Sequence, residues 1–458
     1  MAAPVRLIVL NYNGGAYVLE CLDALKRLDW PAESLELVVV DNASVDGSAD
    51  AIADRHPDVR LIRNERNTGF PANNLGLRDL QGVRYVGLVN NDGFVEPDWL
   101  THLAAALDED PTLGAAAAKL VFAPQFVDVR IQSPTFAPGG GDPRRLGVQL
   151  RGVRVDGADA WGDAQLAEGG GGLEHDRDGP FEWTTGDATL RIPLPRPAEA
   201  DADAGTAAVE LDLLAPSATK VTITSGSETT TVEVGPGRAT VALTAAGEPY
   251  DVVQNAGSMV LTDGAGADRG FLQRDDGRWD APAEVFAWCG GSVLLRADYV
   301  EQTGAFDERF FLYYEDTDWS WRGRAQGWRY RYVPRAVMRH KHAASSGEGS
   351  PVFAHHVERN RLLMLVKDAP ARLALTQVVR FVLVTASYAR RDVLGPVRRG
   401  HRPNTTTVRR RIGSFVDFLG LAPAMLRDRR ELRRRQVVPD RELTAWLVPP
   451  DQRDRHDR

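Results

Sequence analysis

The sequence predicts an α/β protein with a mostly parallel sheet covered by helices on both faces, an inserted all-β domain and a helical C-terminal region. Short apolar runs alternate with helical patterns over residues 1–120, and the same character returns after Phe286. Between about residues 147 and 248 the chain is instead rich in Gly, Thr, Val and Asp. From Phe353 onward the pattern is mostly helical and rich in Arg. Strands that alternate with helices are typical of a parallel sheet buried on both faces.

Each apolar run in the N-terminal part ends in a polar loop. The runs are Val5–Leu10, Leu35–Val40, Val59–Ile62 and Tyr85–Val89. Because parallel sheets bind ligands at the carboxyl ends of their strands, we expect a ligand site where these loops meet. Further along the chain, residues 330–333 have the pattern of another strand, which Pro334 is expected to end.

The middle of the chain has the pattern of an all-β domain. Residues 221–224 and 231–234 alternate with period two, and a Gly-Pro-Gly turn leads into residues 240–243. Short alternating strands joined by such turns predict a small sandwich-like domain. Its acidic loops contain no spaced ligand motif, so we expect a structural or partner-binding role.

Charge is distributed unevenly along the chain. The net charge is −8, yet residues 371–458 carry 20 Arg, no Lys and 9 acidic residues, which gives +11 and leaves −19 for the remainder. A basic tail favours an anionic partner, either a membrane leaflet or nucleic acid. Aromatic residues are scarce in the tail, which argues against nucleic acid. Its longest uncharged stretch, Phe381 to Ala389, has nine residues, well below the roughly 20 that span a bilayer.

The cysteines and the N-terminus indicate the compartment. Cys21 and Cys289 are far apart and show no metal-ligand spacing, which fits a reducing environment. Residues 1–6 lead directly into an apolar run without the layout of a signal peptide. We therefore expect a cytoplasmic protein.

Residues 313–319, with the sequence Tyr-Tyr-Glu-Asp-Thr-Asp-Trp, place acidic side chains beside aromatic ones. A carboxylate next to aromatic walls is partly desolvated, which raises its pKa and makes it a better general base. Aromatic faces also suit a sugar ring. The alternative is a normal helix start, where an N-cap Asp and acids in the first turn are favoured.

Three polar segments follow strands at the expected ligand-binding edge. Asp41 could accept a hydrogen bond from a base imide or a ribose hydroxyl, although no Gly-x-Gly-x-x-Gly or phosphate loop accompanies it. Residues 67–76 contain Gly and amide side chains that allow close approach to a phosphate or ribose; a capped helix start is the alternative. Residues 90–92, Asn-Asn-Asp, suit a hard divalent cation or a simple turn.

Together these segments resemble the family 2 glycosyltransferases of the GT-A fold, particularly the bacterial rhamnosyltransferase-like and galactofuranosyltransferase-like members. The resemblance covers roughly residues 4–125 and 250–368. The matching stretches are Leu10–Asn13, Val39–Ser44, Asn67–Phe70 with Asn73 and Gly76, Asn90–Asp92, Cys289–Ser292, Phe306–Phe311 and Tyr314–Asp318.

The resemblance implies how the chain is divided. Residues 1–146 are expected to form the nucleotide-sugar-binding half of the GT-A domain, and residues 249–369 its acceptor half. Outside the resemblance, composition and period-two alternation predict an inserted β domain at residues 147–248, and the Arg-rich helical pattern predicts a basic helical C-terminal region at residues 370–458.

The resemblance also implies roles for individual residues on the donor side. The nucleotide-sugar would be bound by Asn11, Asn13, Asp41, Asn67, Gly69, Asn73 and Asn91. A divalent metal, Mg or Mn, would be held by Asp92 as the principal carboxylate, by His340, and by Asn90 as a weak partner. The family's metal motif is Asp-x-Asp, and here Asn90 stands in place of its first acid.

On the acceptor side the resemblance implies that Asp316 is the catalytic base, with Glu315 beside it. Acceptor contacts would come from Trp288, Gly290, Gly291, Tyr314, Asp318 and Trp319. For the aromatic residues Trp288, Tyr314 and Trp319, packing in the core is the alternative. The expected reaction is a single in-line displacement with inversion, and the cation stabilises the leaving diphosphate.

The implied function is transfer of a sugar from a nucleotide-diphosphate donor to a cell-envelope glycan or lipid-linked glycan. A deoxythymidine- or uridine-diphosphate sugar is expected, with rhamnose or galactofuranose as the leading sugars. The basic tail would hold the enzyme at the inner face of the plasma membrane, without a nucleic-acid partner. The alternatives are a nucleotidyltransferase and a non-catalytic nucleotide-sugar or glycan-binding protein.

Overall fold

The computed structural model describes residues 2–139, 142–194, 205–341 and 350–453, which belong to two units. The first unit comprises Met1–Ala123, Val253–Phe271 and Asp276–Arg458. The second comprises Pro124–Val252 and Leu272–Asp275.

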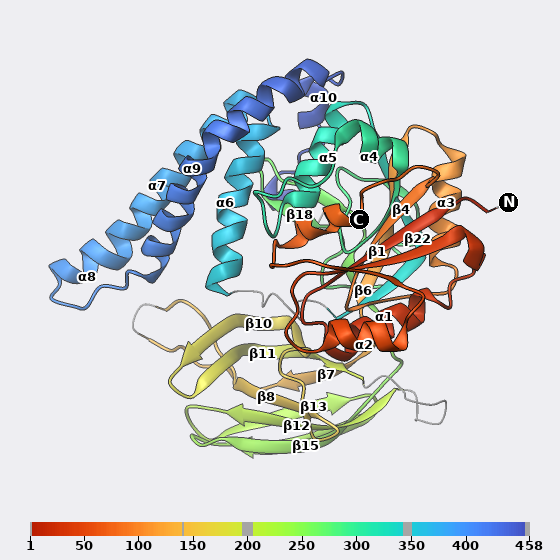
Figure 1. The fold of residues 1–458 in the computed structure, drawn as a ribbon. Helices are drawn as coiled ribbons and strands as arrows, with labels where there is room; N and C mark the ends of the chain where they lie inside the picture. The colour runs from red at the N-terminus through yellow and green to blue at the C-terminus, as the bar shows by residue number, and fades with distance from the viewer. Residues whose placement is uncertain (1, 140–141, 195–204, 342–349, 454–458) are drawn as a thin grey trace. The chain divides into compact units, whose positions relative to one another are not determined.

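The first unit is built on a mixed sheet (Figure 1). Its parallel part has the order β4-β1-β2-β3, and β21, β6 and β22 continue it beyond β4. The strands are β1 (Val5–Asn11), β2 (Leu35–Asp41), β3 (Arg60–Arg63), β4 (Tyr85–Asn90), β6 (Leu113–Phe122), β21 (Ser292–Arg296) and β22 (Arg329–His340). Shorter strands of this sheet are β5 (Gly93–Val95), β16 (Val252–Asn255) and β20 (Ala283–Glu284). β17 (Ser258–Val260) and β18 (Gly266–Asp268) form a separate two-stranded sheet. The predicted α/β class and mostly parallel GT-A arrangement are confirmed.

Alternation along β1 buries side chains on both faces of this sheet. Leu7 and Val9 pack in one core with residues of α1 and α3, whereas Ile8 packs in a second core with Trp319 of α5. The covering helices are α1 (Gly15–Leu25), α2 (Ser48–Arg55), α3 (Trp99–Glu109), α4 (Ala297–Thr303) and α5 (Glu315–Ala325). A strand with apolar side chains on both faces needs such double cover.

The strand predicted to end at Pro334 is longer than expected. β22 continues to His340, and its pairing with β6 shifts between Val333 and Val337. Proline cannot donate a ladder hydrogen bond, and the irregularity at this point lets the strand tolerate it. The continuation brings His340 level with Gly93 of β5.

The C-terminal region is helical, as predicted. Ser350 accepts a hydrogen bond from the Phe353 N–H and starts α6 (Pro351–Lys367). α7 (Ala371–Tyr388), a π-helical segment (Ala389–Leu394) and α8 (Gly395–Arg398) follow, and α9 (Thr406–Arg435) returns beside α7 before α10 (Asp440–Thr444), as Figure 1 shows. Among the described helices, none combines the length and the apolar character needed to cross a membrane.

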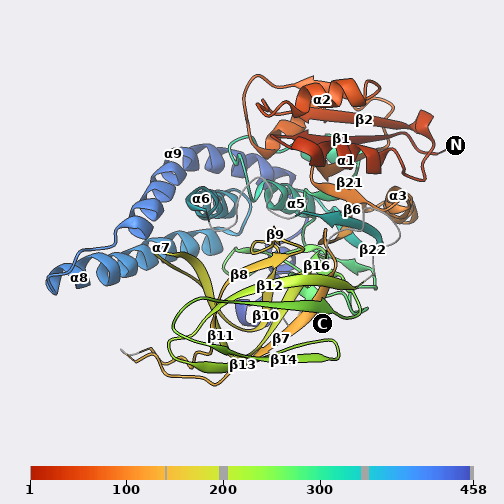
Figure 2. The ribbon, with the colours of Figure 1, turned by 90° about the horizontal axis from the view of Figure 1, so that it is seen from below.

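The second unit is a single strongly curved sheet around its own apolar core (Figure 2). The hydrogen-bonded order is β14-β13-β7-β11-β8-β12-β15, so the strands form one sheet where two were expected. They are β7 (Phe126–Gln132), β8 (Gln149–Val155), β9 (Ala158–Asp159), β10 (Gln165–Asp176), β11 (Gly179–Pro193), β12 (Thr206–Leu214), β13 (Thr219–Ser225), β14 (Glu228–Val234) and β15 (Ala239–Ala246). The short strand β19 (Gln273–Arg274) lies in this unit outside that sheet. The unit begins at Pro124, before the expected boundary at 147, because β7 pairs with β11 and β13.

Candidate functional site

A cavity of about 560 Å³ lies in the first unit at the carboxyl ends of β1 and β4. It brings together residues that lie far apart in the sequence. The expected site residues that line it are Asn67, Gly69, Asn90, Asn91, Asp92, Gly290, Gly291, Glu315, Asp316 and His340. The rest of its wall is formed by Leu10, Tyr12, Asn42, Phe70, Cys289, Phe311, Leu312, Tyr313, Ser350, Val352 and Phe353.

Asn11 and Asp41 lie side by side behind the cavity wall. Parallel pairing of β1 and β2 sets the two residues opposite each other, and the Asn11 amide donates to Asp41 Oδ1 over 2.9 Å. The same amide contacts Ser44 and Ser48, and both Asn11 and Asp41 are buried. These hydrogen bonds hold the ends of β1 and β2 together. Asn13 lines a smaller neighbouring cavity of about 170 Å³ together with Asn91 and Asp92.

Asn42 holds the loop that carries Asn67 and Gly69. Its side-chain amide donates to Asn67 Oδ1 over 2.8 Å, and its oxygen accepts the Thr68 N–H at 3.0 Å. Both bonds fix the loop at the cavity wall. Asn73 is buried and donates to the Phe70 carbonyl, so its side chain shapes this turn outside the cavity lining. Asn42 lies in the motif of residues 39–44, but only its side-chain contacts show this role.

The loop of Gly69 is locked against the segment before α5. The Phe70 N–H donates to the Phe311 carbonyl over 2.7 Å. Gly69 has φ +75°, and a Cβ there would lie 1.9 Å from the same carbonyl oxygen. A glycine is required on both counts.

The segment before α5 has a strained backbone. Phe311, Tyr313 and Tyr314 all have positive φ, at 64°, 69° and 70°. Such angles are costly for bulky side chains and persist only where the surroundings hold them. The buried Asn360 of α6 supplies this restraint, because its amide lies 2.7–2.8 Å from the carbonyls of Phe310, Leu312 and Tyr313.

The segment delivers Glu315 and Asp316 to the cavity in the first turn of α5. Asp316 accepts hydrogen bonds from the Gly290 N–H at 3.1 Å and from the Thr317 N–H at 2.6 Å. Burial raises the pKa of Asp316 even though these bonds lower it. Burial also raises the pKa of Glu315 well above its ordinary value, and the charge of Asp316 raises it further. Glu315 Oε2 has no hydrogen-bond partner among the described residues.

Asp268 of β18 is a third carboxyl near this pair. It accepts hydrogen bonds from Asn255 and Ser258. Burial raises its pKa to about 6, and the charge of Asp316 adds to the effect. The sequence alone gave no signal for it, because Asp268 lies in no recognisable motif.

Asp92 and His340 meet at another part of the cavity lining. His340 Nε2 lies 2.9 Å from Asp92 Oδ1 and 3.1 Å from the Asn90 amide nitrogen. Its Nδ1 lies 2.8 Å from Gln254 Oε1, an arrangement in which Nδ1–H donates and Nε2 is directed at Asp92. Metal-ligating histidines are usually oriented in this way by their second nitrogen. Among the described residues, no three His, Cys, Asp or Glu side chains are grouped to hold a metal ion.

These side chains nevertheless fit a cation that a bound ligand also coordinates. One carboxylate and one imidazole nitrogen converge at a cavity wall, and Mg²⁺ is usually bound by one or two carboxylates together with phosphate oxygens. Asp92, His340 and the Asn90 side chain would form the protein part of such a site.

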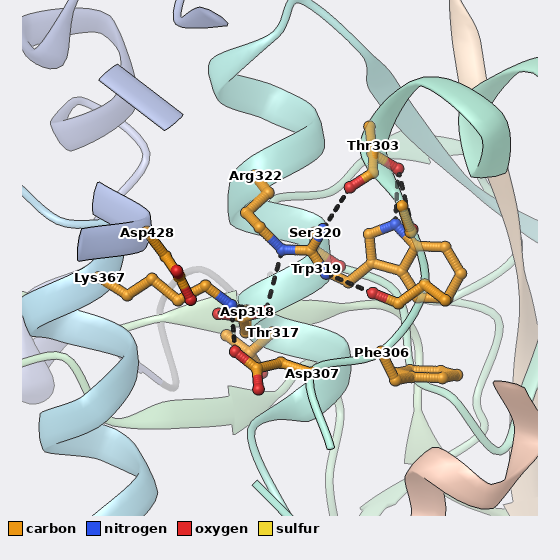
Figure 3. Close-up of polar contacts among 12 residues, drawn as sticks. Thr303, Phe306, Asp307, Thr317, Asp318, Trp319, Ser320, Arg322, Lys367 and Asp428 are labelled. Atoms are coloured by element: carbon orange, nitrogen blue, oxygen red, sulfur yellow. Dashed lines mark hydrogen bonds and ion pairs between the residues drawn. The ribbon is translucent and has the colours of Figure 1, made fainter. Parts of the chain in front are cut away.

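Four of the expected acceptor residues lie in the interior. Trp288 and Trp319 are fully buried with ring centroids 5.4 Å apart. Tyr314 is buried and its hydroxyl accepts the Gly266 N–H. Asp318 is also fully buried and pairs with cationic side chains (Figure 3). None of the four lines the cavity, because all four side chains are buried in the core. The aromatic wall comes instead from Phe70, Phe311, Tyr313 and Phe353.

Comparison with known proteins gives a match over the N-terminal part of the chain. Residues 7–146 match the family model described as glycosyl transferase family 2, which confirms the resemblance there. An N-acetylglucosaminyl-diphospho-decaprenol L-rhamnosyltransferase of Mycobacterium tuberculosis (strain CDC 1551 / Oshkosh) is 44% identical over 72 residues, 15% of this chain and 24% of the relative. The poly(ribitol-phosphate) beta-N-acetylglucosaminyltransferase TarS of Staphylococcus aureus (strain Mu50 / ATCC 700699) is 30% identical over 107 residues, 22% of this chain and 18% of TarS.

The matched stretches therefore span about a quarter or less of these relatives. Among solved structures, GalNAc-T7 with UDP, GalNAc and Mn2+ overlaps 80% of this chain and 50% of its own, at 12% identity and a TM-score of 0.41. A TM-score of this size indicates only a partial similarity of the two folds.

Proposed function

We propose, from the glycosyl transferase family 2 domain that residues 7–146 form, that this chain is an inverting glycosyltransferase that moves a sugar from a nucleotide-diphosphate donor to an acceptor hydroxyl. One observation carries the proposal beyond the family. A single cavity is lined by a buried carboxylate pair, Glu315 and Asp316, and by the Asp92–His340 pair. The first pair can accept a proton and the second can hold a cation, which are the two requirements of the transfer.

Asp316 is the general base in this proposal. The raised pKa strengthens it as a base, and its hydrogen bonds from Gly290 and Thr317 fix the carboxylate in place. Glu315 holds the proton of the pair in this proposal, because burial and the charge of Asp316 raise its pKa well above the ordinary value. Its protonated side chain can then donate to an acceptor hydroxyl and orient it toward Asp316.

The donor lies on the other side of the cavity in this proposal. Asn67, Gly69 and Asn91 are at its wall and would contact the nucleotide-sugar, while Asn11, Asp41 and Asn73 hold the loops that carry the wall. Asp92 and His340, with Asn90, would hold a divalent cation. When bound, such a cation stabilises the negative charge of a leaving diphosphate.

The acceptor side is apolar and aromatic. Phe311, Tyr313 and Phe353 are flat or bulky surfaces that suit the face of a sugar ring. The matched relatives are named as enzymes of a decaprenol-linked glycan and of poly(ribitol-phosphate). We therefore expect a cell-envelope glycan or lipid-linked glycan as acceptor, and a uridine- or deoxythymidine-diphosphate sugar as donor.

The test is a screen of nucleotide-sugars with the purified full chain. Thermal unfolding is measured with each donor, with and without Mg²⁺ or Mn²⁺, and release of nucleoside diphosphate is measured in parallel with envelope glycan fractions as acceptors. Bound ligand raises the melting temperature by mass action. A donor that stabilises the chain and is consumed supports the proposal. Stabilisation without any turnover favours a binding protein. Release of pyrophosphate when a nucleoside triphosphate and a sugar 1-phosphate are supplied instead would indicate a nucleotidyltransferase.

A further inference from the structure

The helical hairpin of α7 and α9 exposes a stripe of apolar side chains. The exposed residues are, on α7, Leu375, Val379, Val382 and Leu383 and, on α9, Ile412, Val416, Leu419 and Leu426. Each of them is at least 45% exposed. Spacings of three, four and seven residues place them along one side of each helix. We call this set of eight residues the hairpin stripe.

Both halves of the hairpin stripe face the same side. On α7 the buried Phe381 is followed directly by Val382, and on α9 the buried Phe418 is followed directly by Leu419. Successive residues of a helix point about 100° apart. On both helices the exposed side chains are therefore rotated from the buried ones by the same angle and in the same sense. The helices run antiparallel, as Figures 1 and 2 show, and the rings of Phe381 and Phe415 stack 5.7 Å apart. Because the two helices are antiparallel, equal rotations away from the buried side chains turn both sets of exposed side chains toward the same side of the hairpin.

Arginines extend the stripe along α9. Arg409 precedes Ile412 by three residues, and Arg430 follows Leu426 by four, so both continue the same side of the helix. Arg427 lies between them and is exposed like the other two. None of these three arginines pairs with a carboxylate among the described residues.

Acidic side chains avoid this side of the hairpin. α7 contains none. On α9, Asp417 pairs with His355 of α6 at 3.0 Å, and Asp428 pairs with Arg309 near the start of α5. The third acid, Glu431, pairs with arginines of the same helix. The hairpin stripe is therefore an apolar surface with unneutralised positive charge beside it.

Apolar side chains beside positive charges favour one class of partner. A second copy of the chain docked stripe to stripe would bring arginines against arginines, which is unfavourable. An anionic lipid surface offers acyl chains for the apolar residues and phosphates for the guanidinium groups. The helices are also too short or too polar to span a bilayer, whereas an amphipathic helix can lie in its interface.

We propose that the hairpin stripe docks on an anionic phospholipid surface, with α7 and α9 lying in the plane of the interface. The proposal rests on the exposure and charge of the hairpin and is independent of the proposed transfer reaction. It gives the predicted basic tail a defined contact face.

Vesicle flotation of the full chain tests this docking. Vesicles of phosphatidylcholine alone are compared with an equimolar mixture of phosphatidylcholine and phosphatidylglycerol, at low and high salt. We expect flotation only with the anionic vesicles, and weaker flotation at high salt. The triple variant I412E/V416E/L419E is expected to bind at least about tenfold more weakly. Each Arg→Gln change at 409, 427 or 430 is expected to weaken binding about fivefold.

A matched control and a second measurement keep the test decisive. Leu173 of β10 is similarly exposed but lies in the second unit, so L173E must float like the native chain. Circular dichroism verifies that each variant is folded, since all the changed residues are exposed. Absence of flotation with anionic vesicles, or flotation that the triple variant leaves unchanged, overturns the proposal. A native dimer in light scattering that the triple variant converts to monomer would assign the stripe to a second copy and also overturn it.

Discussion

At the scale of single residues, the proton chemistry depends on Asp316. Asp316→Asn keeps the shape of the side chain and its contact with the Gly290 N–H, but it removes the ability to accept a proton. Loss of a general base lowers turnover by about 10²–10⁴-fold. We expect kcat to fall by this amount while donor affinity, measured by calorimetric titration, stays the same.

Glu308→Gln is the matched control for this change. Glu308 precedes α5 by a few residues, is exposed and does not line the cavity, so the variant should retain native turnover. Native turnover by Asp316→Asn would remove the base assignment while leaving the family assignment intact.

The buried Glu315 makes stability depend on pH. Its pKa is raised well above the ordinary value, first by burial and then by the charge of Asp316. Between its unfolded and folded pKa values, the unfolded state loses the proton that the folded state keeps, so stability falls as pH rises through this window. Glu315→Gln carries no ionisable proton and should therefore melt at a higher temperature than the native chain at pH 7. Below the unfolded pKa the two chains should melt alike. An equal difference at both pH values would contradict this linkage.

At the scale of elements, the site depends on two loops that touch at Gly69. Gly69→Ala would place a Cβ 1.9 Å from the Phe311 carbonyl oxygen, in addition to the cost of a positive φ. Gly82→Ala is the matched control, because Gly82 has φ +81° and nothing within 4 Å of its Cβ position. The φ penalty alone is about 1–2 kcal/mol. Denaturant unfolding should show that loss for Gly82→Ala and a distinctly larger one for Gly69→Ala.

A buried ionic cluster also holds helix α5 in place. Lys367 of α6 donates to Asp307 at 2.7 Å and to Asp318 at 2.8 Å, and Asp318 is paired with Arg322 as well (Figure 3). Burial alone would raise the pKa of Asp307, but the bonds from Arg309 and Lys367 hold it below its ordinary value. The cluster therefore keeps the Asp307 carboxylate ionised inside the protein and ties α5 to α6.

Lys367→Met would leave Asp307 and Asp318 buried without this cation. Breaking a buried pair from one side costs about 3–5 kcal/mol. Denaturant unfolding should show a loss of this size. Arg391→Met is the control, because the Arg391–Asp392 pair is exposed and contributes little. A loss for Lys367→Met as small as that of the control would mean that the cluster does not hold the two helices together.

These elements show how far the sequence could predict the site. Asp92, Glu315 and Asp316 could be placed at one ligand-binding edge because each begins a loop or helix in a recognisable pattern. The roles of Asn42 and Asn360 could not, because each depends on carbonyls or amides in other loops. Asp318 and Trp319 are expected at the acceptor from the family resemblance, which does not fix the direction of their side chains. Successive residues of a helix point about 100° apart, and packing against α6 and the sheet turns these two inward.

At the scale of the whole molecule, the chain contains units with separate hydrophobic cores. The core of the second unit consists only of residues between Val127 and Ala245, and the two cores of the first unit's sheet contain none of them. The sequence predicted an inserted β domain from composition and period-two alternation. It missed the start at Pro124, because β7 is a single strand whose partners follow much later in the chain.

Separate cores predict separate unfolding transitions. Leu211 is fully buried in the second unit and Leu103 is fully buried in the first, so the pair provides matched Leu→Ala changes of equal chemistry. Each should cost about 2–5 kcal/mol through lost contacts and a cavity. Scanning calorimetry of the full chain should therefore show one transition lowered by Leu211→Ala and another lowered by Leu103→Ala. If either variant shifts the whole unfolding profile as a single transition, the two units unfold as one cooperative body and the inserted domain contributes directly to the stability of the site.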